Sequence, residues 1–191
     1  ALGPSGVIES QTAIQAKGVH YRVSGLLASD DDGRAFDGGC FATFYLCPRD
    51  YHRIHAPVAG KVVRSVHIPG GLLPVFPEST ALHEDLFVRN ERLITYLQSK
   101  QFGTVAVVKV GATVVGKITV TYDPDMVSNV KDGQRTEREY SEPLQVAKGG
   151  EIGTFHMGST VVLLFQKDRI QLNSLPERRP IFLGWPIGRK A

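Results

Sequence analysis

The sequence has few of the residues that would assign it to several common classes of protein. Its 191 residues include only two cysteines, Cys40 and Cys47, and no C-x-x-C pair, which argues against a structural zinc site. We expect both to be buried thiols rather than a disulfide. No stretch approaches the roughly 20 apolar residues of a membrane-spanning helix. A net charge of +3 is too small to indicate nucleic-acid binding.

The beginning of the chain lacks the basic and then apolar segments of a signal peptide. It opens directly with ALGPSGVIES, which is rich in turn-forming residues. We therefore expect either that a further N-terminal region precedes this start or that tag residues form it.

Helix-forming patterns are also scarce. Only residues 78–93 are rich in helix formers, and because their apolar period is poor we expect a short helical turn there. Short runs rich in Val, Ile, Phe and Tyr predict strands instead. These runs cover residues 40–48, 60–70, 92–100, 103–122, 158–168 and 169–172. The sequence thus predicts a mainly β fold, α+β at most, with short strands and few short helices in a single domain over residues 1–191.

Two details of the strand pattern can be stated more closely. Residues 103–122 should form two strands that are interrupted at Gly111, with a bulge or bend at Gly116. Residues 158–168 and 169–172 should form a final hairpin.

Three segments are predicted to lie on the surface. Residues 29–39 are acidic and glycine-rich, and residues 123–143 are charged and poor in apolar side chains, so we expect both to be loops. The last residues, 175–191, mix proline, arginine and the lone Trp185 and should lie over the surface.

The stretch PRDYHRIHAPVAGKV, residues 48–62, gathers side chains that often carry chemistry. His52 and His55 flank Arg53, and Asp50 lies just upstream. A metal site would need a third ligand, which the sequence does not indicate. Since histidine is the usual proton carrier near neutral pH, a catalytic pair and a structural pair both remain open.

Two other stretches are weak when taken alone. HEDLFVRNERL, residues 83–93, is rich in charge, and its residues by themselves favour a solvated face. FHMGSTVVLLF, residues 155–165, puts Gly158, Ser159 and Thr160 before an apolar run. A tight turn leading into a buried strand is the simpler interpretation, and a serine activated as a nucleophile is the other.

Taken together, these stretches resemble the phosphatidylserine decarboxylase family. The combination of PRDYHRIH, LFVRNER and a GST near the end of the chain is specific to that family, whereas each piece alone is weak. The matching pieces follow the family's order and cover most of residues 5–170: QAKGVHY (15–21), FYLCPRDYHRIHAPVAG (44–60), VFP (75–77), LFVRNERL (86–93), VKVGATVVGKI (108–118) and GEIGTFHMGSTVVLLF (150–165).

The resemblance implies an enzyme that makes its own cofactor. In this family the serine of the GST motif, here Ser159, attacks the carbonyl of the preceding glycine, here Gly158. The chain is cut between the two residues, and the serine becomes an N-terminal pyruvoyl group. Its carbonyl forms a Schiff base with the amine of phosphatidylserine and withdraws electrons as the carboxylate leaves, so that phosphatidylethanolamine is released. Glycine is expected to allow the strained backbone that the attack needs.

The resemblance also implies roles for both histidines and a setting for the enzyme. His55 is expected to be the base of an Asp-His-Ser triad in self-cleavage, and His52 to serve in the proton step of decarboxylation. The resemblance implies a barrel-sandwich hybrid core. It also implies that the protein binds peripherally to the cytoplasmic face of an anionic membrane. The resemblance implies neither a metal ion nor a nucleic-acid partner, and it is compatible with a homodimer. The family's N-terminal membrane-associated helices are not found in this sequence.

One departure from the family pattern affects the triad. The family's acid lies in a P-x-D-G motif, and alignment with GPSGVIES puts Ser5 at that position. A serine cannot stabilise the charge of an imidazolium as a carboxylate does, so we expect slow self-cleavage and an unprocessed precursor unless another acid, such as Asp50, serves. Two alternatives stay open: a relative that decarboxylates a soluble amino acid, and a processing-dead, non-catalytic variant.

Overall fold

A computed structural model describes residues 1–16, 19–113, 117–174 and 176–191 and confirms the mainly β prediction. The helices are short: α1 (Val23–Leu27), α2 (Asp30–Ala35), α3 (Pro77–Leu82) and α4 (Leu86–Arg89). The strands are β1 (Leu2–Val7), β2 (Thr12–Ala16), β3 (Val19–Arg22), β4 (Cys40–Tyr45), β5 (Arg53–His55), β6 (Gly60–Ile68), β7 (Arg92–Ser99), β8 (Gly103–Val110), β9 (Ile118–Val120), β10 (Thr136–Val146), β11 (Glu151–Phe155), β12 (Thr160–Phe165), β13 (Ile170–Leu172) and β14 (Gly188–Lys190).

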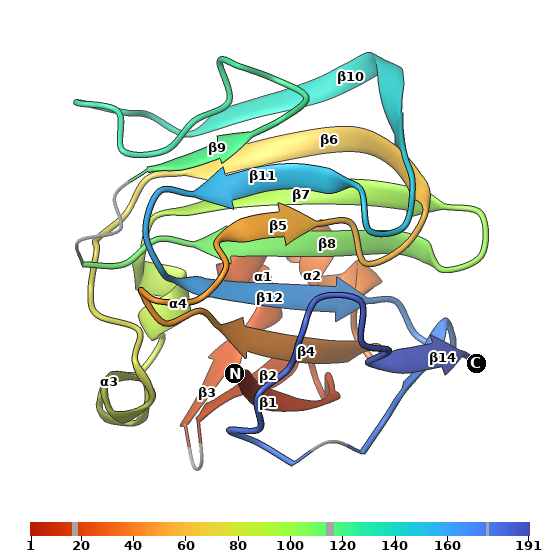
Figure 1. Cartoon of the computed structure of the whole chain (residues 1–191), viewed down its shortest axis with the longest axis horizontal. Coiled ribbons are helices and arrows are strands. Elements are labelled where there is room, and N and C mark those ends of the chain that lie inside the picture. Colours follow the sequence, from red (N-terminus) through yellow and green to blue (C-terminus); the bar gives the residue numbers. More distant parts are fainter. Residues whose placement is uncertain (17–18, 114–116, 175) are drawn as a thin grey trace.

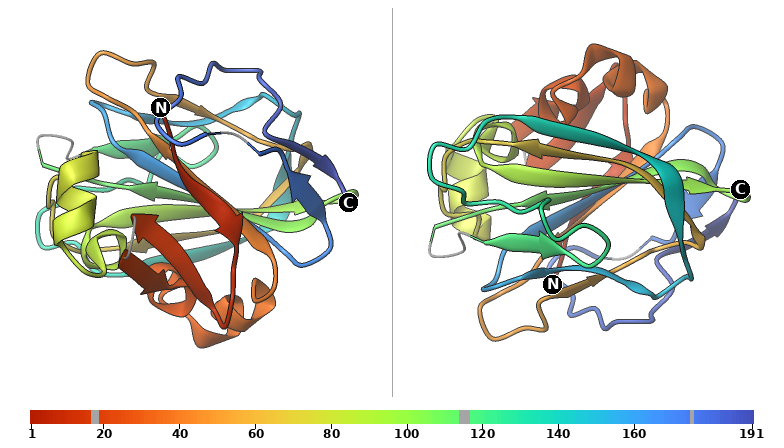
Figure 2. Two further views of the ribbon diagram at one scale, coloured as in Figure 1. Left: turned by 90° about the horizontal axis from the view of Figure 1, so that it is seen from below. Right: turned by 90° about the horizontal axis from the view of Figure 1, so that it is seen from above.

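Half of the strands named above belong to one antiparallel sheet that is covered on both faces (Figure 1). Its order is β1-β4-β12-β8-β7-β6-β10. A smaller sheet of order β5-β11-β9 lies over one face, and α1, α2 and the β2–β3 pair lie over the other, as the views from below and above show (Figure 2). Among the helices of the described residues, none is long and apolar enough to cross a membrane.

Strand β12 lies in the interior of the large sheet. All of its residues, Thr160 to Phe165, are buried, which is why the apolar run is continuous rather than alternating. Its first residue, Thr160, pairs with Tyr45 of β4 on one side and with Val110 of β8 on the other. The segment that leads into β12 therefore lies between the ends of two neighbouring strands.

The prediction of a final hairpin is wrong. β12 pairs with β4 and β8, while β13 pairs with β14. Nearness in sequence suggested the hairpin, but the partners of β12 come from much earlier in the chain, and no local pattern specifies such non-local pairing. Gly111 does follow the end of β8, as predicted, whereas Gly116 lies outside the described residues.

Two segments that were predicted to be surface loops contain regular structure. In residues 29–39, Ser29 caps α2 by accepting a hydrogen bond from the backbone N–H of Asp32, and the acidic first turn favours a helix N-terminus. Much of residues 123–143 belongs to β10, an edge strand that is mostly exposed. An exposed edge strand needs few apolar side chains, so its composition resembled that of a loop.

The charged stretch 83–93 is not a solvated face throughout. Its residues Asn90, Glu91 and Arg92 are buried, each at most 6% exposed. Arg92 tethers α1 to the large sheet, and burial lowers its pKa to about 10. The guanidinium donates hydrogen bonds of 2.6–3.0 Å to the carbonyl oxygens of Gly25, Leu26, Val88 and Asn90.

A lysine is fully buried between the large sheet and the small one. Lys109 of β8 has no exposed surface, and its Nζ donates to Thr95 Oγ1 at 2.5 Å. The Thr95 hydroxyl also bonds with the Tyr122 hydroxyl at 2.6 Å. Desolvation lowers the pKa of Lys109 to about 7, because burial disfavours the charged ammonium.

The buried lysine should make stability depend on pH. Between pH 7 and about 9 the unfolded chain holds a proton on Lys109 that the folded protein has released, so the free energy of unfolding should rise with pH across this window. Above about pH 9 the raised pKa of the buried Cys40 thiol acts in the opposite direction. The slope for one proton is at most about 1.4 kcal/mol per pH unit. Urea unfolding at several pH values should show this rise, and Lys109→Met should abolish it while stabilising the protein at neutral pH.

Lys61→Met is the matched control, because Lys61 is exposed on β6. It should leave the pH dependence of unfolding unchanged. Equal slopes for the unmodified protein and Lys109→Met would show that the lysine is not desolvated as described.

Candidate active site

The GST turn brings Ser159 to the junction of three backbone segments. Ser159 is fully buried, and its hydroxyl donates a hydrogen bond to the carbonyl oxygen of Val110, the last residue of β8. Its own carbonyl oxygen accepts a hydrogen bond of 2.7 Å from the N–H of Leu46, just beyond β4. The serine is therefore held by backbone groups on both sides and has no free rotation into solvent.

Gly158 is required at this turn because other backbone approaches it closely. A Cβ at this position would lie 2.4 Å from the carbonyl oxygen of Leu46 and 2.8 Å from the nitrogen of Pro48. The φ angle of Gly158 is not positive, so a left-handed backbone is not what requires glycine here. The constraint is steric: only a residue without a side chain fits against the 46–48 segment.

His52 lies against the same segment. Its Nε2 is 2.9 Å from the carbonyl oxygen of Pro48, and its backbone oxygen accepts from the N–H of Phe155 at 3.0 Å. Its Nδ1 is buried and has no hydrogen-bond partner among the described residues. An imidazole with one nitrogen fixed and the other unpaired can accept or deliver a proton on the free side.

His55 is held in a different way, by partners that carry no charge. Its Nδ1 is 2.8 Å from the carbonyl oxygen of Gly149, and its Nε2 is 2.8 Å from the Tyr51 hydroxyl. The Tyr51 and His55 rings also stack with centroids 5.6 Å apart. The ring is thus oriented by two hydrogen bonds and one stacking contact.

The nearest acidic residue to His55 along the strand pairing is Glu151, its Cα partner in β11. The Glu151 carboxylate accepts two hydrogen bonds from Arg53, at 2.9 and 3.0 Å, and this holds the pKa of the carboxyl below its usual range. Asp50 is likewise engaged, since its carboxylate accepts from the N–H of Cys47 at 2.8 Å. Both acids therefore have other hydrogen-bond partners.

Ser5, which the sequence pattern predicts to replace the acid of the triad, lies on β1. It is opposite Ala42, which is opposite Leu163 of β12. Since Leu163 is four positions beyond Ser159 and β1 is two strands away from β12, standard strand dimensions separate Ser5 from Ser159 by roughly 15 Å. The fold therefore brings His52 to the segment that contacts Gly158, and places Ser5 farther along the sheet.

Several contacts of the turn could not be found from the sequence. Val110, Leu46, Pro48 and Gly149 act through backbone atoms, which leave no signature in residue type. Tyr51 is the exception, because it stands four residues before His55 within PRDYHRIH and carries a hydroxyl that can reach the ring.

The described residues hold no group of three or more histidine, cysteine or acidic side chains arranged to bind a metal ion. Cys40 and Cys47 are free thiols, of which Cys40 is buried and Cys47 half-buried.

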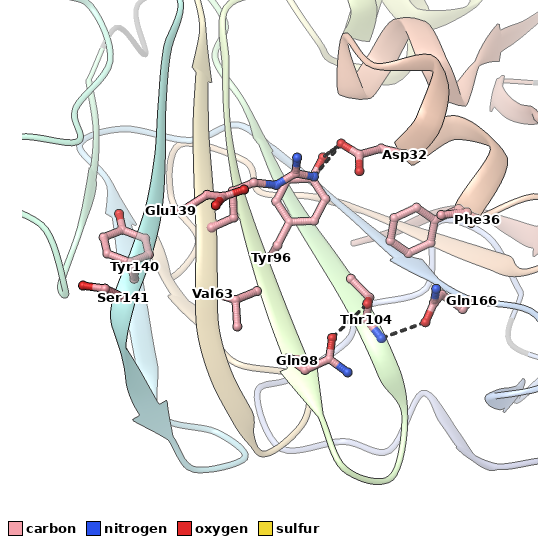
Figure 3. A pocket seen from close by; sticks show the side chains of 12 residues that line it. Asp32, Phe36, Val63, Tyr96, Gln98, Thr104, Glu139, Tyr140, Ser141 and Gln166 are labelled. Atoms are coloured by element: carbon pink, nitrogen blue, oxygen red, sulfur yellow. Dashed lines mark hydrogen bonds and ion pairs between the residues drawn. The ribbon is translucent and has the colours of Figure 1, made fainter.

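A pocket of about 580 Å³ lies away from the turn, between α2 and strands β6, β7 and β10 (Figure 3). Two of its charged groups are paired with each other, since Asp32 accepts from Arg64 at 2.6 Å, and Asp32 also accepts from the Tyr96 hydroxyl at 2.8 Å. None of the three residues of the GST turn lines it. The chemistry indicated by Ser159 and the histidines therefore lies elsewhere.

Comparison with known proteins agrees with this geometry. The family model described as phosphatidylserine decarboxylase matches residues 4–189. A phosphatidylserine decarboxylase proenzyme of Anaeromyxobacter sp. (strain K) is 42% identical over 195 aligned residues, covering 100% of this chain and 68% of that protein. The proenzyme of Myxococcus xanthus (strain DK1622) is 45% identical over 176 residues, covering 92% and 62% respectively. The chain thus spans about two-thirds of the length of these relatives, and it belongs to the phosphatidylserine decarboxylase family.

Proposed function

We propose that this chain is the catalytic part of a proenzyme that cuts itself between Gly158 and Ser159 and then decarboxylates phosphatidylserine to phosphatidylethanolamine. The observation that carries the proposal is the buried Ser159, which follows a glycine packed directly against the 46–48 backbone. The names of the relatives specify phosphatidylserine and a proenzyme. A soluble amino acid as substrate gains no support from them.

Self-cleavage begins when the Ser159 hydroxyl leaves the Val110 carbonyl and attacks the carbonyl carbon of Gly158. The new C–O bond replaces the C–N bond between the two residues, and the hydroxyl proton passes to a base, for which we propose His55. Elimination from the resulting ester separates the chain, and hydrolysis of the dehydrated residue releases ammonia. The close contacts around Gly158 favour this sequence, because they hold the reacting groups with little freedom.

The pyruvoyl group that replaces Ser159 would supply a carbonyl that takes up the amine of the substrate and withdraws electrons as carbon dioxide leaves. The site fits such a group, since it is fully buried and cradled by a turn with no room for a side chain at Gly158. We propose that His52 moves the proton in this stage, because its Nδ1 is buried without a hydrogen-bond partner among the described residues and its Nε2 contacts Pro48, which lies against Gly158. We further propose peripheral association with the cytoplasmic face of a membrane.

The chain with Ser5 should cleave itself slowly. The two ring nitrogens of His55 bond to uncharged groups, so no carboxylate is hydrogen-bonded to the ring to offset the positive charge that forms when the imidazole takes a proton. If Ser5 occupies the position of the missing acid, Ser5→Asp should accelerate cleavage, by up to about four orders of magnitude. Intact mass under denaturing conditions, followed over time, measures the fraction cut.

Ser174→Asp is a control of equal charge on an exposed residue and should not change the rate. Rapid and complete cleavage of the unmodified chain would contradict the expectation. Slower cleavage in Glu151→Gln would then identify Glu151 as the acid.

Ser159→Ala should abolish both processing and decarboxylation. In the Ser5→Asp background, the variant should remain a single uncut chain, fail to react with a hydrazide reagent for carbonyl groups, and release no carbon dioxide from phosphatidylserine vesicles. Ser174→Ala in the same background should behave like its parent. Decarboxylation by the Ser159→Ala protein would exclude the proposed cofactor.

Gly158→Ala should also block cleavage, through sterics rather than chemistry. The added Cβ would lie 2.4 Å from the Leu46 carbonyl oxygen, so the turn must shift, and we expect a loss of stability on the order of 2 kcal/mol. Gly71→Ala is the matched control, because a Cβ there meets nothing closer than 3.7 Å. Intact mass measures the fraction of cleaved chain, and thermal unfolding measures the loss of stability. A Gly158→Ala protein that cleaves itself at the same rate as its parent would refute the steric explanation.

A further inference from the structure

Three large apolar side chains are exposed together between β13 and β14. Phe182 is 63% exposed, Leu183 64% and Trp185 48%. The rings of Phe182 and Trp185 pack edge to face with centroids 5.2 Å apart. Single exposed apolar residues are common on soluble proteins, but three within four positions form a patch, which needs a partner.

Basic side chains flank this patch on both sides in the sequence. Arg178 and Arg179 precede it and Arg189 and Lys190 follow it, and all four are exposed. The Arg179 guanidinium lies 5.9 Å from the centre of the Trp185 ring. Between residues 173 and 191 the only acid is Glu177. Aromatic and aliphatic side chains framed by arginine and lysine are typical of segments that enter the interfacial layer of an anionic membrane.

The patch also lies beside the candidate active site. A ladder of backbone hydrogen bonds connects the two across the ends of β12, β4 and β1: Leu46 N to Ser159 O (2.7 Å), Tyr45 N to Ala1 O (2.9 Å), Leu2 N to Arg179 O (3.0 Å) and Arg178 N to Leu2 O (2.8 Å). Three strand spacings separate Ser159 from the 178–179 segment, which is about 14 Å.

The views of the fold agree with this ladder. The 46–52 loop and the C-terminal loop lie on the same side of the molecule, the side nearest the viewer in Figure 1 and uppermost in the left view of Figure 2. A surface that receives the C-terminal loop would therefore also face the 46–52 segment, which contacts Gly158.

We propose that residues 178–190 dock the protein on an anionic phospholipid bilayer, with Phe182, Leu183 and Trp185 entering the interfacial layer and the four basic side chains contacting headgroups. The proposal rests on the proposed function only in that the substrate is a lipid. A second copy of this chain fits the patch less well, because a two-fold contact would bring the arginines of both copies together.

Trp185 is the single tryptophan of the chain, so its fluorescence reports on this patch alone. The probe is a vesicle of equimolar phosphatidylcholine and phosphatidylglycerol, which contains no substrate. We expect Trp185 emission to shift to the blue on binding, to be quenched by lipids with brominated acyl chains, and to respond much less to phosphatidylcholine alone. Failure of decarboxylation with intact vesicle binding would count against the proposed function and leave the docking surface standing.

Two double variants test the apolar and the electrostatic contributions to vesicle binding separately. Phe182→Ser with Leu183→Ser should weaken vesicle binding by at least roughly ten-fold. Arg178→Gln with Arg179→Gln should weaken it by about five-fold for each charge removed and reduce its sensitivity to salt. The matched controls are Leu82→Ser, on a side chain that is 79% exposed on α3, and Lys100→Gln, neither of which should affect binding.

Three results would overturn the proposal. One is Trp185 emission that does not change with anionic vesicles. Another is equal loss of binding in the Leu82→Ser control. The third is emission already shifted to the blue without lipid, together with a dimer in sedimentation that the Phe182→Ser and Leu183→Ser changes dissociate, because the occupant would then be a second copy.

Discussion

The close contact between Gly158 and the backbone of residues 46–48 is the constraint on which the site depends. Strand β12 lies between β4 and β8, so the turn before it must pass through the narrow space where those two strands end. The Leu46 carbonyl leaves no room for a side chain at Gly158, and the next residue, Ser159, is fixed by backbone groups on either side. The Ser159 hydroxyl and the carbonyl of Gly158 are close because the two residues are neighbours in sequence. The surrounding sheet also restricts their freedom to move apart.

The layers around the large sheet explain why polar side chains can be buried so deeply. Arg92 uses its guanidinium to satisfy carbonyl groups at α1 and around α4, on the helical side. On the other side, Lys109 and Thr95 connect to Tyr122 beyond β9, and His67 pairs with Glu91 at 2.7 Å. Each of these groups is hydrogen-bonded, as buried polar groups must be if the fold is to be stable. Together they fix how the small sheet and the helices sit on the large one, and thereby the position of β5 with His55.

The same arrangement would suit the lipid substrate that we propose. The start of β12, the end of β4 and the start of β1 lie side by side at one end of the sheet. The C-terminal segment forms backbone hydrogen bonds with β1. A substrate whose headgroup must reach a buried residue, while its acyl chains stay in a membrane, requires a reactive turn near a surface that tolerates lipid. The C-terminal loop, which carries the ring pair of Phe182 and Trp185, lies on the same side of the molecule as the 46–52 loop, where that requirement would be met (Figure 2).

The sequence by itself determined the mainly β class, the positions of β4, β6, β7 and β8, and the identity of Gly158, Ser159, His52 and His55 as candidates, because strand propensity and short motifs are local properties. It did not determine that residues 29–39 contain a helix, that residues 136–146 form an edge strand, or that β12 pairs with β4 and β8 instead of β13. Its residues favoured a solvated face for the charged stretch 83–93, which is wrong for Asn90, Glu91 and Arg92. Only the tertiary structure decided these points, because they depend on which distant segments meet. The requirement for glycine at residue 158 shows the difference most clearly, since the atom that excludes a side chain there belongs to Leu46, more than a hundred residues earlier in the chain.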